Sequence, residues 1–255
     1  MSYNKTAVKT MKILELFYEH DTLTLAEMVK LTDMPKTSVH RLIKSLEEMS
    51  LLQKTIDGAY RLGFVFLRFG QLVSERLSLR KIAKPYMEKL QKEVGQAVNL
   101  IIQDGNEAIY IEKIDGDQPV RVYTAIGRRA PLYAGACPRI LLTYFSKEEQ
   151  ENYINNTTFV PFAKGTVTDE NELRDMLQTA KDNGYTISYS ELENHTAAIA
   201  APIFGSDDMV IGGMSISGLE AEYDETAIIK WIESLTQTTK QVSIELGWKE
   251  KKVGE

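Results

Sequence analysis

The run GMSIS at 213–217 is the part of the sequence that comes nearest to a catalytic motif. It matches the nucleophile elbow G-x-S-x-G except at its last position, Ser217, and its strand-like context has no sharp turn to expose a serine. The single cysteine, Cys137, lies near the N-terminus of a predicted helix, where a thiol pKa can fall, but we interpret it as a small packed residue. Of the three histidines only His195 lies in the C-terminal part. The sequence therefore predicts no enzyme.

Metal and cofactor chemistry is also not predicted. No set of His, Cys, Asp and Glu has the spacing of a metal site, and the sequence has no glycine-rich phosphate loop of the Walker type. We expect no cofactor.

A different chemistry, recognition of phosphates and base edges, is indicated between residues 36 and 49. Apolar residues recur there at helical spacing and predict the buried stripe of a helix: Val39, Leu42, Ile43, Leu46 and Met49. The opposite face is polar and basic, without an acid before Glu47. It carries Lys36, Thr37, Ser38, His40, Arg41, Lys44 and Ser45. Such a face fits a DNA major groove, although taken alone it fits the solvated side of a helical bundle equally well.

The neighbouring elements favour the DNA interpretation. A helix is expected over residues 5–19, with Val8, Met11, Leu14 and Tyr18 inward and Ile13 and Phe17 beside them. The pair Thr24 and Glu27 forms a capping box that starts a second helix, and Pro35 suits the first turn of the third.

Two short strands, 51–54 and 59–62, are expected to follow around an Asp57-Gly58 turn. Three helices and a hairpin make a winged helix-turn-helix, whose wing would place Lys54, Tyr60 and Arg61 near the sugar-phosphate backbone. The alternative is a winged helix that contacts only proteins, and the polar outer face of the third helix, without an acid before Glu47, disfavours it.

The charge distribution is compatible with this interpretation. The net charge is −6, but residues 1–62 hold nine Lys/Arg against eight Asp/Glu. Phosphate attraction is local, because salt screens it within about 8 Å. The sequence has no membrane-length apolar run, no secretory signal and no cysteine pair, so we expect a cytoplasmic protein without membrane contact.

The remainder predicts a linker helix over 63–79 and an α+β domain over 80–255. The linker is apolar on more than one side, which indicates burial against a partner chain or against its own domain. Helices are expected at 80–95, 136–155, 169–183 and 224–246. Strands are expected at 97–104, 107–114, Val120–Tyr123, 185–192, 196–204 and 209–218.

Long segments resemble one known family. TLAEMVKLTDMPKTSVHRLIKSLEEMSLLQKTIDGAYRLG is similar to the DNA-binding domain of the IclR family of bacterial regulators, and APLYAGACPRILL, GYTISYSELENHTAAIAAPIF and GGMSISG resemble its effector-binding domain. The resemblance implies a dimerising linker helix and a GAF/PAS-like α+β sensor domain. It also implies that Lys36, Thr37, Ser38, His40 and Arg41 lie on the recognition helix.

The resemblance also indicates where an effector would bind. Gly135-Ala136 precedes a predicted helix whose N-terminal amides attract anions, and Ser215 and Ser217 share one face of a strand. The alternative is a simple turn beside edge serines. Matched by motif, Ser188 stands where some relatives carry Asp, and Ala198 where some carry Cys. These departures argue against transferring a known ligand such as glyoxylate or pyruvate.

We therefore predict a DNA-binding transcriptional regulator, a repressor rather than an activator, modulated by a small polar, anionic metabolite. It should act as a homodimer, or a dimer of dimers, on half-sites about 10 bp or a multiple apart. Base edges are assigned to Thr37, Ser38, His40 and Arg41, with Arg41 on guanine. Phosphates are assigned to Lys36, Lys44, Lys54, Tyr60 and Arg61. Effector contacts are assigned to Gly135, Ala136, Ser188, Ala198, Ser215 and Ser217.

Overall fold

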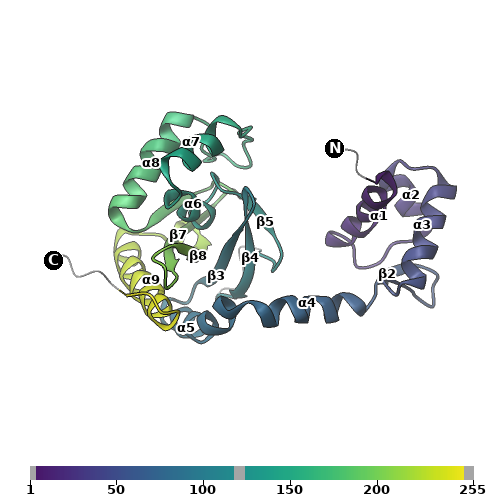
Figure 1. The fold of residues 1–255 in the computed structure, drawn as a ribbon, viewed down its shortest axis with the longest axis horizontal. Helices are drawn as coiled ribbons and strands as arrows, with labels where there is room; N and C mark the ends of the chain where they lie inside the picture. The colour runs from purple at the N-terminus through teal and green to yellow at the C-terminus, as the bar shows by residue number, and fades with distance from the viewer. Residues whose placement is uncertain (1–3, 118–123, 250–255) are drawn as a thin grey trace. The chain divides into compact units, whose positions relative to one another are not determined.

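The computed structural model describes residues 4–117 and 124–249, and the chain divides into two compact units, Met1–Arg76 and Leu77–Glu255 (Figure 1). The strand predicted at Val120–Tyr123 lies outside the described residues. The predicted linker helix is the last element of the first unit, and it ends at Arg76.

The first unit consists of helices, a small hairpin and the linker helix after it. Its elements are α1 (Lys5–Glu15), η1 (Leu16–Tyr18), α2 (Leu25–Thr32), α3 (Lys36–Glu48), β1 (Leu52–Lys54), β2 (Tyr60–Leu62) and α4 (Val65–Arg76). The capping box begins α2 as expected: Thr24 Oγ1 accepts from the Glu27 N–H at 3.3 Å, and the Glu27 carboxylate accepts from the Thr24 N–H at 2.7 Å. Asp33 is left-handed, and the chain turns there towards α3.

The core of this unit contains Val39, Ile43 and Leu46 from α3, as the stripe predicted. The predicted inner face of the first helix was wrong in part. Ile13 and Phe17 are buried, whereas Val8, Met11 and Tyr18 are exposed. Tyr18 lies in a 3₁₀ turn at Leu16–Tyr18, where a face extrapolated at 3.6 residues per turn drifts away from the core. Val8 and Met11 precede that turn; the packed stripe runs through Ile13 and Phe17, on a different side of the helix.

In its described residues, the second unit has a six-stranded antiparallel sheet with helices on both faces (Figure 1). Its strand order is β5-β4-β3-β8-β7-β6. The strands are β3 (Ala97–Asp104), β4 (Glu107–Ile114), β5 (Arg129–Pro131), β6 (Thr186–Tyr189), β7 (Thr196–Phe204) and β8 (Val210–Leu219). Helices α5 (Ser78–Val94) and α9 (Glu225–Glu245) pack against one face. Helices α6 (Ala136–Thr143), α7 (Lys147–Asn155) and α8 (Glu170–Asn183) cover the other.

Two features of this unit differ from the sequence prediction. The helix expected at 136–155 is two helices, because a second capping box begins a new one: Ser146 Oγ accepts from the Glu149 N–H at 3.2 Å. The strand β5 was not predicted. It has only three residues and is recognisable through its pairing with β4, where Ala130 lies opposite Ala108.

Small residues allow α6 to approach the sheet closely. A Cβ on Gly213 of β8 would lie 2.8 Å from a side-chain carbon of Ile140 in α6. The glycine therefore lets the helix and the strand meet, which brings the N-terminus of α6 to the sheet beside Ser215 and Ser217.

Candidate functional site

The outward face of α3 is the first candidate surface. Lys36, Thr37, His40, Arg41 and Lys44 are exposed on it and Ser38 is half-buried. Among the described residues, the structure gives no ion pair to any of these side chains. The face is therefore able to contact an anionic polymer without first breaking an internal salt bridge.

The wing supplies the other predicted DNA contacts. Lys54 is exposed at the end of β1, with its Nζ 5.9 Å from the centre of the Tyr60 ring. Tyr60 is half-buried, and its backbone pairs with Leu23. Arg61 is exposed and donates to Gln53 Oε1 at 3.0 Å from Nη2. The hairpin is thus tied to the helices by a backbone bridge, while the charged ends of Lys54 and Arg61 remain at the surface.

The second candidate site is a cavity of about 50 Å³ between the N-terminus of α6 and the sheet. All six residues predicted for effector binding line it: Gly135, Ala136, Ser188, Ala198, Ser215 and Ser217. Strand register explains why residues so far apart meet, since Ala198 lies opposite both Ser188 and Ser217. On the next row of the sheet, Ser215 lies opposite Asn99.

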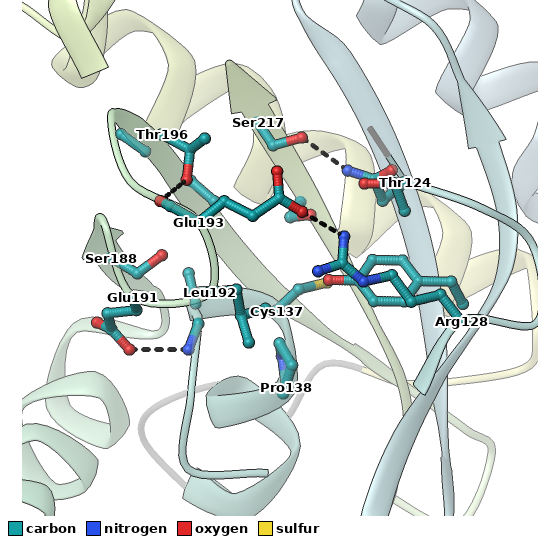
Figure 2. A pocket seen from close by; sticks show the side chains of 17 residues that line it. Thr124, Arg128, Cys137, Pro138, Ser188, Glu191, Leu192, Glu193, Thr196 and Ser217 are labelled. Atoms are coloured by element: carbon teal, nitrogen blue, oxygen red, sulfur yellow. Dashed lines mark hydrogen bonds and ion pairs between the residues drawn. The ribbon is translucent and has the colours of Figure 1, made fainter. Parts of the chain in front are cut away.

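Gly135 caps α6 in a conformation that requires glycine. Its φ is 86°, and a Cβ there would lie 2.9 Å from Leu192 Cδ1. Gly135 was predicted to contact the effector, but its N–H already donates to Glu191 Oε2 at 2.8 Å (Figure 2). A ligand would have to compete with Glu191 for this N–H. The first helical amides, those of Ala136 and Cys137, are left without an acceptor inside the helix.

Glu191 belongs to a buried ion pair that sequence reasoning missed. Arg139 Nη1 donates to its two oxygens at 2.9 and 2.7 Å, and both side chains are buried. The Arg139 guanidinium also donates to the Ile187 carbonyl at 2.7 Å and to Thr186 Oγ1 at 3.2 Å. The pair therefore connects α6, β6 and the segment after β6.

A second ion pair lies at the cavity. Arg128 Nη1 donates to Glu193 Oε1 at 2.7 Å, and both side chains are partly exposed (Figure 2). Both residues line the cavity together with Thr124 and Asn99. None of these four stood out in the sequence, because no local spacing relates Asn99 or Arg128 to the loop after β6. The single sequence signal was that Glu191 and Glu193 lie within a segment that resembles the family.

The remaining cavity groups do not form catalytic machinery. Burial raises the pKa of the Cys137 thiol to about 12, and a hydrogen bond with Ser215 lowers it only in part. Burial also raises the pKa of Tyr110. Ser215 lies in the middle of β8, without a strained turn. Across residues 4–117 and 124–249, no three His, Cys, Asp or Glu side chains gather as a metal site, and no helix has the length and apolarity to cross a membrane.

Comparison with known proteins finds a matching family model in each of the two units. A model described as "IclR helix-turn-helix domain" matches residues 6–55, and one described as "Bacterial transcriptional regulator IclR C-terminal" matches 71–244. The regulator KipR of Bacillus subtilis is 54% identical over 96% of this chain and 98% of its own. The repressor AllR of Salmonella paratyphi A is 29% identical over 85% and 80%.

A solved structure has the same fold. The IclR homologue of Microbacterium hydrocarbonoxydans, complexed with 4-hydroxybenzoate, superposes with a TM-score of 0.81 at 24% identity, over 95% of this chain and 99% of its own.

The fold and the sites define a helix-turn-helix transcription regulator that joins a DNA-binding unit to an α+β unit. Its relatives are named transcriptional regulators, so the class is not enzymatic. More particularly, the chain belongs to the IclR family of bacterial transcriptional regulators.

Proposed function

We propose that this regulator is a sequence-specific operator-binding repressor whose DNA affinity changes when a small polar, anionic metabolite occupies the cavity beside α6. The observation that carries the DNA-binding half is the exposed face of α3, which has Lys36, Arg41 and Lys44 and no acid before Glu47. Repression, rather than activation, is supported by the relative AllR, which is a named repressor. We place its action in the cytoplasm, where the DNA of bacteria lies.

The test of DNA recognition is binding to DNA from upstream of the protein's own gene, against scrambled DNA, across a salt series. A preference of about a thousandfold, with affinity that falls steeply as salt rises, supports a specific regulator. No binding even at low salt would favour the protein-contact alternative.

Arg41 is the residue assigned to a guanine. Arg41→Ala should weaken operator binding by about 1–3 kcal/mol and relax preference at one base position. Lys230→Ala, which removes an exposed charge from α9, is the charge-matched control and should leave binding unchanged. Lys54→Ala should instead weaken binding to all sequences alike and reduce the salt slope by about one.

An anionic effector is supported by the amides of Ala136 and Cys137, which have no acceptor within α6, and by Arg128 at the same cavity. The solved relative complexed with 4-hydroxybenzoate, which is a carboxylate, also favours this class. Effector affinity measured by calorimetry should fall in the Ser215→Ala/Ser217→Ala double variant. An unchanged affinity would count against this cavity.

A homodimer, or a dimer of dimers, is supported by α4, where Leu67, Phe69 and Val73 are exposed. A monomer seldom leaves so many large apolar side chains on one short helix in water. Phe69→Ser should lower the dimer fraction in sedimentation and operator affinity with it, whereas Tyr18→Ser removes an exposed ring elsewhere and serves as control. Monomers that retain full operator affinity would overturn the role of the dimer in DNA binding.

A further inference from the structure

Asn99 has an unpaired polar atom in the cavity wall. The residue is 2% exposed, and its Nδ2 donates to Ser217 Oγ at 2.8 Å, the hydrogen bond drawn at Ser217 in Figure 2. Its Oδ1 has no hydrogen-bond partner among the described residues. Buried polar atoms in folded proteins are almost always paired. An unpaired oxygen that lines a cavity therefore indicates that the occupant of the cavity supplies the partner.

The chemistry of that partner follows from the atom. An amide oxygen only accepts hydrogen bonds, so the occupant must donate one, as a hydroxyl or an ammonium group does. The N-terminus of α6, in the same cavity, has the opposite requirement, because the amides of Ala136 and Cys137 donate and need an acceptor. One ligand that meets both requirements carries a carboxylate and a hydrogen-bond donor a short distance apart.

The volume of the cavity limits the length of such a ligand. A water molecule needs about 10–15 Å³ of such space, so about 50 Å³ holds on the order of three to five water-sized groups. A three-carbon carboxylic acid with one polar group on its second carbon matches this size. Larger ligands would require the cavity to open.

The charged side chains at the cavity are compatible with a ligand that carries a hydroxyl and with one that carries an ammonium group. Glu191 is neutralised by Arg139 and Glu193 by Arg128. A ligand carboxylate can share Arg128 with Glu193, while a ligand ammonium can approach the Glu193 carboxylate. A hydroxyl and an ammonium are thus two sources of the same donor chemistry.

We propose that Asn99 is a specificity-determining residue that selects carboxylates bearing a hydroxyl or ammonium donor on the adjacent carbon. The inference rests on the proposed function of the cavity as the effector site. Asn99 Oδ1 accepts a hydrogen bond from the hydroxyl or ammonium group, and the amides of Ala136 and Cys137 donate to the carboxylate.

The test uses four probes of nearly equal size with the full-length protein: propionate, pyruvate, lactate and alanine. The second carbon bears only hydrogen in propionate, a carbonyl oxygen in pyruvate, a hydroxyl in lactate and an ammonium group in alanine. Calorimetry should show that lactate, alanine or both bind at least about tenfold more tightly than pyruvate and propionate, because a site built to pair with a donor rejects the analogue without one. If lactate binds more tightly than alanine, the preferred donor is a hydroxyl; if alanine binds more tightly, it is an ammonium group.

Asn99→Leu should abolish this preference, because the side chain keeps its approximate size and loses the oxygen. The matched control is Asn155→Leu on the exposed end of α7, which should keep it. If Asn99→Leu does not fold, Asn99→Asp provides the second variant. It retains an acceptor and adds a negative charge, so it should still reject pyruvate and should shift the preference towards alanine.

Each other result overturns a defined part of the proposal. Equal binding of all four probes, tighter binding of pyruvate than of lactate, or a preference that persists in Asn99→Leu would each overturn the role of Asn99. In those cases the cavity would remain a carboxylate site. If none of the four probes binds, the small-carboxylate class proposed for the effector fails as well.

Discussion

Breaking the buried ion pair between Arg139 and Glu191 tests the structure of the cavity wall most directly. Arg139→Met removes four hydrogen bonds: two to Glu191, one to the Ile187 carbonyl and one to Thr186. The Glu191 carboxylate, whose side chain is 3% exposed, is then left as a buried charge with the Gly135 N–H as its remaining donor of those described.

The expected loss in the free energy of unfolding is large for a single substitution. Removing one partner of a buried ion pair destabilises a protein by about 3–5 kcal/mol, because the other charge stays buried and unpaired. Arg139→Met and Glu191→Met should each fall in this range. The double variant leaves no uncompensated charge, only neutral groups such as the Gly135 N–H. It should therefore be destabilised by much less than the two single losses together, with a coupling of at least about 2 kcal/mol.

Urea unfolding followed by tryptophan fluorescence measures these values. Both tryptophans, Trp231 and Trp248, belong to the unit Leu77–Glu255, so their emission reports that unit alone. The reasoning would be refuted if either single variant lost less than about 1 kcal/mol, or if the losses of the two single variants simply added in the double variant.

Four further predictions concern three single residues. The Cys137 thiol, with its pKa raised by burial from 9.0 to about 12, should react with iodoacetamide at pH 8 about a thousandfold more slowly in the folded than in the urea-unfolded protein; equal rates would contradict its burial. The unfolded thiol ionises first, so this group should also lower stability as the pH rises above 9. Ile43→Ala, in the core of the first unit, should destabilise that unit by about 2–5 kcal/mol in circular dichroism while leaving the tryptophan transition in place. Glu193→Gln should raise affinity for lactate about threefold, because a partly exposed pair with Arg128 contributes about 0.2–1 kcal/mol; weaker lactate binding would mean that Glu193 itself holds the ligand.

Local signals allowed much of the first unit to be predicted from sequence. The capping box at Thr24 and Glu27 joins residues three apart, and the buried stripe of α3 repeats within one helix, so neither depends on distant parts of the chain. The second capping box, at Ser146, was equally local, and overlooking it merged α6 with α7. The face of α1 was predicted wrongly because packing, which periodicity alone does not determine, decides that Ile13 rather than Val8 and Met11 is buried.

Some residues of the candidate cavity were likewise predicted from local sequence signals. Gly135, Ser215 and Ser217 were proposed from short motifs, and a resemblance added Ser188 and Ala198; the structure brings all of them to one cavity. Whether they bind an effector stays a prediction.

The sequence by itself determined the helices, the hairpin and the family, because helical periodicity, helix caps and family motifs depend only on residues that are close together in the chain. Only the tertiary structure decided the charge and hydrogen-bonding state of the cavity. Asn99 and Ser217 meet through strand pairing, Arg128 and Glu193 meet through the approach of two loops, and Glu191 takes the Gly135 amide. Partners separated by dozens of residues in the chain leave no local pattern, so their pairing follows only once the sheet has set its register.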